Sequence, residues 1–169
     1  VINDGSTDNS GTICQEYAQK DNRIVYIEKE NGGQAEARNM GLDRVTGSYV
    51  SFVDSDDWVE LDYVETLYKK ITEYQADIAV GNYCKFNESD SNFYFHISGN
   101  YFEKLYDNVS IVDCLNDSNR LLNSALIVAW GKIYRKEIIS NFRFPVGIVT
   151  EATLFNLKIL LASKSIVYI

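Results

Sequence analysis

The chain has 169 residues, of which 46% are hydrophobic and 24% charged, as is typical of a soluble globular domain with one sizeable core. Its formal net charge of −8 has the wrong sign for a protein that binds nucleic acid by neutralising phosphates, so we expect no nucleic-acid partner. No apolar run approaches the roughly 20 residues that span a bilayer. Three widely spaced cysteines without a C-x-x-C pattern argue against a disulfide framework or a zinc site and favour a cytoplasmic protein.

The first half of the chain alternates β-branched runs with helical spacings of apolar residues. Val1 and Ile2 are typical of the end of a buried strand, so we expect the chain to begin inside a domain. The alternation predicts further strands over 23–27, 49–53 and 77–83, and helices over 13–18, 35–42 and 62–75. This order predicts an α/β fold with a Rossmann-like, mostly parallel sheet flanked by helices, and with ligand sites at the carboxyl ends of the strands.

The second half has a different pattern. A polar stretch over 87–92 predicts an exposed loop, and the residues after it predict a hairpin with its turn at 98–100. We expect a last helix over 150–163 and a last strand over 165–169. Since no linker separates these segments, the sequence predicts a single domain over 1–169.

The strongest local signal is a group of carboxylates at the end of the strand expected over 49–53. Asp54, Asp56 and Asp57 occupy three of four consecutive positions. Crowding them costs like-charge repulsion unless a cation is present, and oxygen ligands favour Mg²⁺ or Mn²⁺ completed by waters and substrate phosphates. The pattern predicts a metal–diphosphate site; the alternative is that these residues merely cap the next helix.

A glycine pair precedes the helix expected over 35–42. Gly32 and Gly33 permit close approach of a ligand to the backbone. Arg38 follows one turn inside the helix, where it can contact a base or a phosphate. The alternatives are an ordinary turn for the glycines and a structural salt bridge for Arg38.

In this order the segments resemble the motifs of the family 2 glycosyltransferases. The resemblance is carried by N-D-G-S-T-D at 3–8, N-x-G-x-x-x-A-R-N-x-G at 31–41, F-V-D-S-D-D-W at 52–58, A-W-G-K-I-Y-R at 129–135, and F-P at 144–145 through Glu151. It spans nearly the whole chain and implies the GT-A fold, an α/β nucleotide-sugar-binding domain. By this resemblance, residues 1–83 form the nucleotide-sugar-binding half and residues 84–169 the acceptor-side half. The family usually starts with a strand and helix that this sequence lacks.

The resemblance implies roles for the residues of the first half. An aspartate in the position of Asp4 and an arginine like Arg38 contact the nucleoside in such enzymes, and Gly33 and Asn39 belong to the same nucleotide-sugar site.

The resemblance also implies roles for the carboxylate cluster. Asp54 and Asp56 are expected to bind the ribose and a Mn²⁺ or Mg²⁺ ion that bridges the diphosphate, while Asp57 assists at the metal. Such a metal stabilises the charge that departs as the bond from sugar C1 to the diphosphate breaks.

Trp130 and Lys132 are expected on the acceptor side through the resemblance alone. Their alternative is a strand with an inward tryptophan and a solvated lysine. Aromatic residues around the expected hairpin either stack on an acceptor sugar or, more simply, pack the hairpin core. These residues are Tyr83, Phe86, Tyr94, Tyr101 and Phe102.

Enzymes of this family invert the anomeric configuration with a carboxylate base that takes the acceptor's proton. The base is commonly the Asp of a Glu-Asp pair near the last helix, whereas here Glu151 is followed by Ala152. Either Glu151 takes the role, or another acid serves, or the protein does not catalyse. The alternative for Glu151 is an acid at a helix start, stabilised by the helix dipole.

We therefore expect a metal-dependent, hexosyltransferase-type glycosyltransferase. It would move a sugar from a nucleoside-diphosphate sugar, with UDP as the nucleotide, to a saccharide or lipid-linked acceptor in cell-surface polysaccharide synthesis. It would act in the cytoplasm at the inner face of the cell membrane, with any membrane association outside this segment. The alternatives are a nucleotide-sugar-binding domain without turnover, suggested by Ala152, and an unrelated Mg²⁺-dependent phosphotransferase.

Overall fold

The computed structural model describes residues 1–95, 103–116 and 120–169, and the chain divides into two compact units. The first unit comprises residues 1–46 and 143–151, and the second comprises residues 47–142 and 152–169. The functional division into halves at residue 83 stays a prediction.

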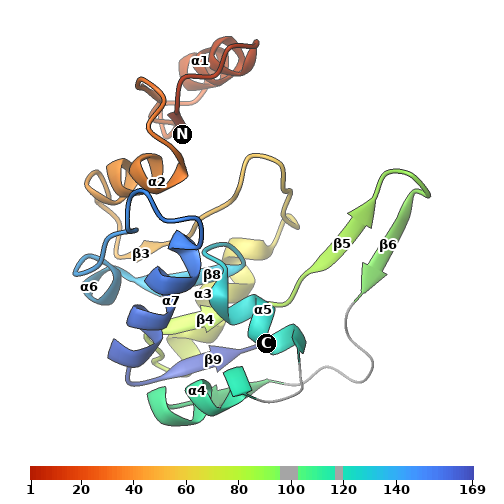
Figure 1. The fold of residues 1–169 in the computed structure, drawn as a ribbon, viewed down its shortest axis with the longest axis vertical. Coiled ribbons are helices and arrows are strands. Elements are labelled where there is room, and N and C mark those ends of the chain that lie inside the picture. The colour runs from red at the N-terminus through yellow and green to blue at the C-terminus, as the bar shows by residue number, and fades with distance from the viewer. Residues whose placement is uncertain (96–102, 117–119) are drawn as a thin grey trace. The chain divides into compact units, whose positions relative to one another are not determined.

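The first unit is built from short strands and helices. Within residues 1–46 these are β1 (Ile2–Asn3), α1 (Ser10–Lys20), β2 (Ile27–Glu28) and α2 (Gln34–Leu42) (Figure 1). β1 and β2 pair in parallel, with Ile2 opposite Ile27 and Asn3 opposite Glu28. The strand predicted over 23–27 is therefore shorter and lies later in the chain, because it pairs only opposite the two residues of β1.

The two predicted helices of the first unit are confirmed, but they differ in burial. α2 buries Ala35 and Leu42. α1 contains no buried residue, and two apolar residues of the range that predicted it, Ile13 and Tyr17, are 52% and 58% exposed. Helical spacing therefore located α1 correctly without indicating how little of its apolar stripe is covered.

The second unit holds the larger sheet. Its described elements are β3 (Tyr49–Val50), α3 (Tyr63–Glu73), β4 (Ile78–Val80), β5 (Cys84–Asn87), β6 (Asn92–Phe95), β7 (Lys104–Tyr106), α4 (Asn108–Asn116), α5 (Arg120–Ile127), β8 (Lys132–Arg135), α6 (Lys136–Ile139), α7 (Glu151–Ala162, of which Glu151 belongs to the first unit) and β9 (Ile166–Tyr168). Five of these strands form one sheet in the order β3-β8-β4-β9-β7 (Figure 1).

This five-stranded sheet is mixed rather than mostly parallel. β4 pairs with β9 in parallel, whereas the pairs β3–β8, β4–β8 and β7–β9 are antiparallel. The mostly parallel arrangement predicted from the alternation is therefore wrong in this respect. The reason is that β8, from late in the chain, lies between β3 and β4, and the order of elements along a sequence does not reveal such an insertion.

A separate two-stranded hairpin, β5–β6, lies where the sequence predicted a loop. Cys84 pairs with Phe95 and Asn87 with Asn92, so the polar stretch forms the turn between the strands. The carboxamide of Asn87 accepts from the backbone N–H of Ser89, and Asp90 accepts from that of Asn92, which explains why polar residues favour a turn here. The turn predicted at 98–100 lies outside the described residues.

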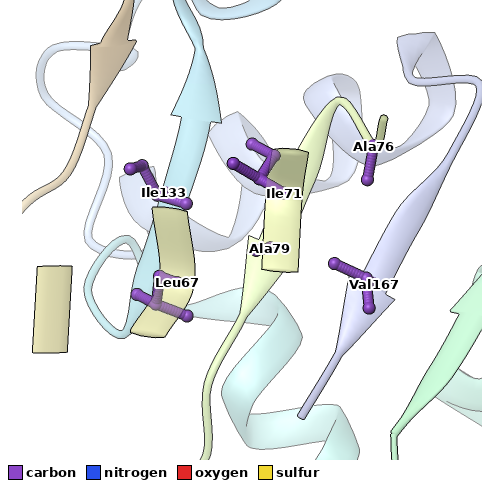
Figure 2. Packing of buried hydrophobic residues seen from close by; sticks show 6 residues of the cluster. All are labelled: Leu67, Ile71, Ala76, Ala79, Ile133 and Val167. Atoms are coloured by element: carbon purple, nitrogen blue, oxygen red, sulfur yellow. The ribbon is translucent and has the colours of Figure 1, made fainter. Parts of the chain in front are cut away.

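One face of the sheet packs against α3 (Figure 2). Leu67 and Ile71 are buried on this helix, whereas Val64 and Tyr68, one turn before Leu67 and Ile71 respectively, are exposed. The cluster consists of Leu67, Ile71, Ala76, Ala79, Ile133 and Val167.

The opposite face of the sheet is covered by α7, the helix predicted over 150–163. Successive residues of a strand point to opposite faces, so Tyr134 faces away from the Ile133 side. Its hydroxyl donates to Oδ1 of Asn156 on α7 at 2.7 Å, and both residues are buried. Phe155, Ile159 and Leu160 of α7 are also buried. Because both faces are covered, all three residues of the central strand β4 have no exposed surface.

Candidate functional site

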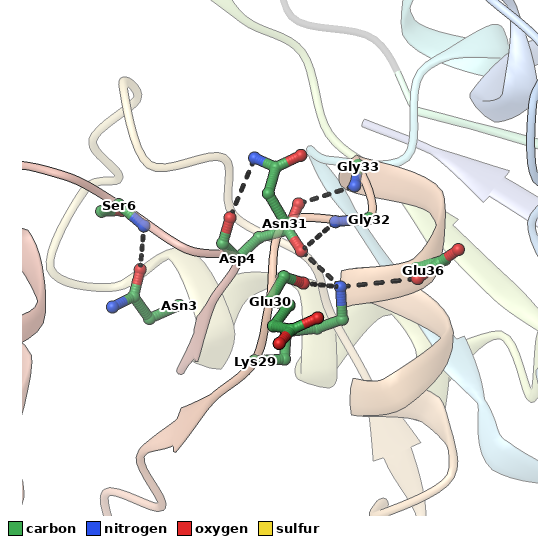
Figure 3. Close-up of polar contacts among 9 residues, drawn as sticks. All are labelled: Asn3, Asp4, Ser6, Lys29, Glu30, Asn31, Gly32, Gly33 and Glu36. Atoms are coloured by element: carbon green, nitrogen blue, oxygen red, sulfur yellow. Dashed lines mark hydrogen bonds and ion pairs between the residues drawn. The ribbon is translucent and has the colours of Figure 1, made fainter.

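Asp4 follows β1 directly, and its carboxylate holds the glycine loop that precedes α2 (Figure 3). Oδ1 accepts from Nζ of Lys29 at 2.6 Å and from the backbone N–H of Gly32 at 3.0 Å. Oδ2 accepts from the N–H of Gly33 at 2.8 Å. Three of the roughly four acceptor positions of the carboxylate are thus occupied within the protein.

The environment of Asp4 favours its charged form. Burial alone would raise the pKa of this carboxyl, but the hydrogen bonds from Lys29, Gly32 and Gly33 outweigh it, so the pKa lies below its ordinary value of 3.8. Lys29 lies next to Asp4 because β1 and β2 pair with Asn3 opposite Glu28. Sequence reasoning missed Lys29, since only this register brings it to Asp4.

Gly33 has a backbone conformation that favours glycine. Its φ of +89° lies in the left-handed region that glycine adopts without strain, and an added Cβ would meet no atom within 4 Å. Gly33 is therefore required here for its backbone conformation rather than for space.

Arg38 and Glu151, which the sequence assigned to different roles, form an ion pair within the first unit. Nη1 of Arg38 lies 3.1 Å from Oε1 of Glu151, and the two side chains are 10% and 13% exposed. The guanidinium also lies 5.3 Å from the centre of the Phe144 ring. The salt bridge named as an alternative for Arg38 is therefore present, and Glu151 lies in the first turn of α7, as its own alternative proposed.

Asn39 fastens the segment around Phe144 to α2. Its side-chain Nδ2 donates to the carbonyl of Phe144 at 2.9 Å, and its Oδ1 accepts from the N–H of Phe144 at 2.8 Å. These two hydrogen bonds resemble those between paired strands, and they hold the segment that precedes Glu151 against α2. The expected contact of Asn39 with a nucleotide stays a prediction.

The carboxylate cluster lies in the second unit, on an irregular segment after β3. The backbone N–H of Asp57 donates to the carbonyl of Asp54 at 3.1 Å, which closes a turn. Burial, with added repulsion from Asp56 and Asp54, raises the pKa of the Asp57 carboxyl above 3.8. The cluster therefore carries negative charge that a cation would relieve.

Oxygen ligands of this kind fit a divalent cation held jointly with a substrate. Across the described ranges, no three His, Cys, Asp or Glu side chains converge as a metal site. Asp56 and Asp57 nevertheless line one pocket, and Mg²⁺ in proteins is commonly held by one or two carboxylates together with substrate phosphates and waters. The residues present fit an ion that binds together with a diphosphate.

The pocket beside this cluster has a volume of about 660 Å³ and lies wholly within the second unit. Aromatic side chains form much of its wall: Trp58, Tyr63, Tyr83, Phe86 and Trp130. The rings of Tyr83 and Trp130 meet edge to face at 5.0 Å, and those of Trp58 and Phe86 at 5.7 Å. Phe86 also packs on Phe93 across the hairpin, with 4.9 Å between the ring centres, and is 38% exposed, so the hairpin packing expected for Phe86 is present together with exposed ring surface. Tyr101 and Phe102 lie outside the described residues.

Lys132 is fully buried and supports the chain next to this pocket. Its Nζ donates to the carbonyls of Ala125, Val128 and Trp130. Burial lowers the pKa of this ammonium to about 7. The solvated lysine named as an alternative is therefore wrong, and an ammonium without exposed surface cannot contact an acceptor directly.

A family comparison agrees with this arrangement. The model of the family described as glycosyl transferase family 2 matches residues 1–142, which include the Asp4 loop, Arg38, the carboxylate cluster and Trp130. The chain belongs to glycosyl transferase family 2.

Two relatives from Streptococcus pneumoniae serotype 4 are similar over nearly the whole chain. Glycosyltransferase GlyA is 56% identical over 170 residues, which cover 100% of this chain and 24% of GlyA. Glycosyltransferase GlyG is 40% identical over 170 residues, which cover 97% of this chain and 56% of GlyG. The chain thus spans about a quarter of one relative and just over half of the other.

Solved structures confirm the fold class. The structures of S. aureus TarS 1–349 in complex with UDP and in complex with UDP-GlcNAc each give a TM-score of 0.75 at 23% identity. Both matches cover 100% of this chain; they cover 47% of TarS in the UDP complex and 46% in the UDP-GlcNAc complex. The mannosyltransferase PcManGT from Pyrobaculum calidifontis, in complex with GDP-Man and Mn²⁺, gives 0.59 at 16% identity, covering 98% of this chain and 43% of PcManGT. The α/β fold of GT-A type expected from the sequence is therefore confirmed. Within the described ranges, no helix is both long and apolar enough to cross a bilayer.

Proposed function

We propose that this chain is the nucleotide-sugar-binding domain of an inverting, metal-dependent hexosyltransferase. It would transfer a sugar from a UDP-sugar to a saccharide or lipid-linked acceptor in cell-surface polysaccharide synthesis, at the cytoplasmic face of the membrane. The observation that carries the proposal is the pair Asp56 and Asp57, which line a pocket of about 660 Å³ in a chain of glycosyl transferase family 2. TarS, bound to UDP and to UDP-GlcNAc, supports UDP as the nucleotide.

In the proposed reaction, an acceptor oxygen forms a bond to sugar C1 as the C1–O bond to the diphosphate breaks. The nucleoside diphosphate leaves with the bonding electron pair, and the acceptor's proton passes to a carboxylate. Asp56 and Asp57 would hold Mn²⁺ or Mg²⁺, which supplies stabilisation of the leaving charge, and Asp54 would bind the ribose. Asp4, through the loop that it holds, and Arg38 would contact the nucleoside, with Gly33 and Asn39 in the same site.

Glu151 is the proposed base. Its Oε1 is engaged by Arg38, so we assign Oε2 as the oxygen that accepts the proton. Ala152, at the position of the usual family base, favours a second candidate, a domain that binds nucleotide sugars without transferring them. Membership of the transferase family decides against the unrelated phosphotransferase.

Calorimetric titration of UDP tests the donor site. We expect UDP to bind in Mn²⁺ and to lose affinity in EDTA, with GDP and CDP binding more weakly. Asp56→Ala should abolish the Mn²⁺-dependent part, whereas Ser55→Ala, an exposed neighbour outside the pocket lining, should leave it unchanged. UDP affinity that is indifferent to Mn²⁺ and to Asp56 would refute the site.

Release of UDP from UDP-GlcNAc, UDP-glucose and UDP-galactose separates the two candidates. Glu151→Gln should abolish release while UDP affinity persists, which would identify Glu151 as the base. If release is absent from the wild type but is gained in Ala152→Asp, the base is missing. UDP binding without release in either protein would favour the binding domain.

A further inference from the structure

The pocket in the second unit has the lining expected of a site for a polyhydroxylated ring. Sugars present C–H faces that pack on aromatic rings and hydroxyls that donate to carboxylates. Trp58 and Trp130 supply such rings, and Asp62 and Glu60 supply carboxylates beyond the Asp56–Asp57 pair. An entirely apolar ligand would displace water from these carboxylates and offer no hydrogen bond in its place, which is costly.

The aromatic wall is built from three separate segments. Trp58 follows the carboxylate cluster and contacts both strands of the β5–β6 hairpin, at 5.7 Å from the ring of Phe86 and 6.2 Å from that of Phe93. Trp130, before β8, contacts Tyr83. Trp58 remains 61% exposed, so one of its faces is available to a ligand.

The charge of the lining is strongly one-sided. Its ionisable side chains with formal charge are four carboxylates, those of Asp56, Asp57, Glu60 and Asp62, and one ammonium, that of Lys85. A divalent cation at Asp56 and Asp57 would neutralise two of the four. Glu60 and Asp62 would still exceed Lys85 by one charge, so an anionic group that does not itself contact the cation would meet repulsion in either state.

We propose that this pocket binds the acceptor sugar and selects sugars that are neutral or carry an amino group, rejecting those with a phosphate. The inference rests on the proposed function and gives the acceptor a chemical class. The test below also detects the opposite preference, in which the pocket binds phosphorylated sugars.

Tryptophan fluorescence offers a direct measurement, because the two tryptophans of the chain both line the pocket. We would titrate the protein with glucosamine, N-acetylglucosamine, glucosamine 6-phosphate and N-acetylglucosamine 6-phosphate, with and without Mn²⁺. We expect the emission to change with the two unphosphorylated sugars and their phosphates to bind at least about tenfold weaker, a difference of about 1.4 kcal/mol. Trp58→Phe and Trp130→Phe would identify which ring reports binding.

Charge variants separate selectivity from general affinity. The double change Glu60→Gln with Asp62→Asn should strengthen binding of the 6-phosphates several-fold and leave N-acetylglucosamine little changed. Glu65→Gln, an exposed change on α3 outside the lining, is the matched control and should change neither. Equal affinity for phosphorylated and unphosphorylated sugars, or no fluorescence change with any of them, would overturn the inference.

The UDP titration keeps the two proposals distinguishable. If UDP binds with Mn²⁺ but the sugars do not bind, this inference fails and the proposed function stands. If the sugars bind with the stated charge preference but UDP does not, the pocket is a saccharide site and the proposed transferase fails.

Discussion

The guanidinium of Arg38 and the carboxylate of Glu151 pair at 3.1 Å although 113 positions separate them in the sequence. Each is therefore the immediate electrostatic environment of the other. A change at either residue alters the environment of both the proposed nucleoside contact and the proposed base, so UDP affinity and UDP release are both measured for each single variant.

A double-mutant cycle measures this coupling. Arg38→Met and Glu151→Gln should each lower the free energy of unfolding by about 1–3 kcal/mol, since each removes an ion pair between two mostly buried side chains. The double variant should lose less than the sum, with a coupling of about 1–2 kcal/mol in urea unfolding. Arg23→Met, which breaks the exposed pair with Asp21, is the control and should have almost no effect. Additive losses would show that the pair contributes nothing.

Asp4→Asn should loosen the glycine loop before α2. The amide nitrogen of Asn would replace one carboxylate oxygen and face N–H donors. The lost hydrogen bonds to a charged group should lower the free energy of unfolding by about 1–3 kcal/mol. Because the pKa of Asp4 is lowered, its contribution is fully present above the ordinary value of 3.8 and is lost as pH falls through the folded value. The stability gap between wild type and variant should therefore close in acid unfolding experiments.

Glu28→Gln is the control for Asp4, since it is an exposed change on neighbouring β2. The free energy of unfolding of Glu28→Gln should match that of the wild type at both neutral and acid pH. A stability gap for Asp4→Asn that is the same at pH 7 and at a pH below the folded pKa of Asp4 would contradict the assigned hydrogen bonds.

Asp56→Asn should lower the pKa of Asp57. Burial is the larger cause of the raised pKa and persists in the variant, whereas the repulsion from Asp56 disappears. Carboxyl ¹³C NMR titration should place the pKa of Asp57 above 3.8 in the wild type and measurably lower in the variant. Ser55→Ala should leave it unchanged. An unshifted Asp57 in Asp56→Asn would show that the two carboxylates do not interact.

The buried Lys132 predicts a pH dependence of stability with a definite sign. Its pKa is about 7 in the folded chain and 10.5 by ordinary value, so the unfolded chain binds more protons between these pH values. Wild type should therefore gain stability relative to Lys132→Met as pH rises from about 7, by up to about 1.4 kcal/mol per pH unit. Lys158→Met, an exposed lysine on α7, should show no pH-dependent difference. A stability difference between wild type and Lys132→Met that does not change with pH would contradict the lowered pKa of Lys132.

Features set by neighbours in the sequence were predictable. The glycine loop before α2, the carboxylates after β3 and the helix that begins at Glu151 all follow from local spacing and turn chemistry. The family resemblance added the order of these motifs, and the family match confirmed it.

Features set by distant pairing were not predictable. Lys29 reaches Asp4 only through the register of β1 and β2, and Arg38 meets Glu151 only because residues 143–151 belong to the same unit as α2. Lysine is mostly found at protein surfaces, yet three backbone carbonyls surround the ammonium of Lys132. Spacing along a chain contains no information about such partners.

The position of β4 has a consequence for how the chain acquires its structure. Its two sheet neighbours, β8 and β9, begin 52 or more residues later, at Lys132 and Ile166. During synthesis residues 1–80 therefore leave the ribosome before either sheet neighbour of the fully buried strand β4 has been made. Non-local pairing of this kind is slow to form. Proteolytic nicking after Tyr83 should yield two pieces that fold only when mixed, because each holds strands whose partners lie in the other.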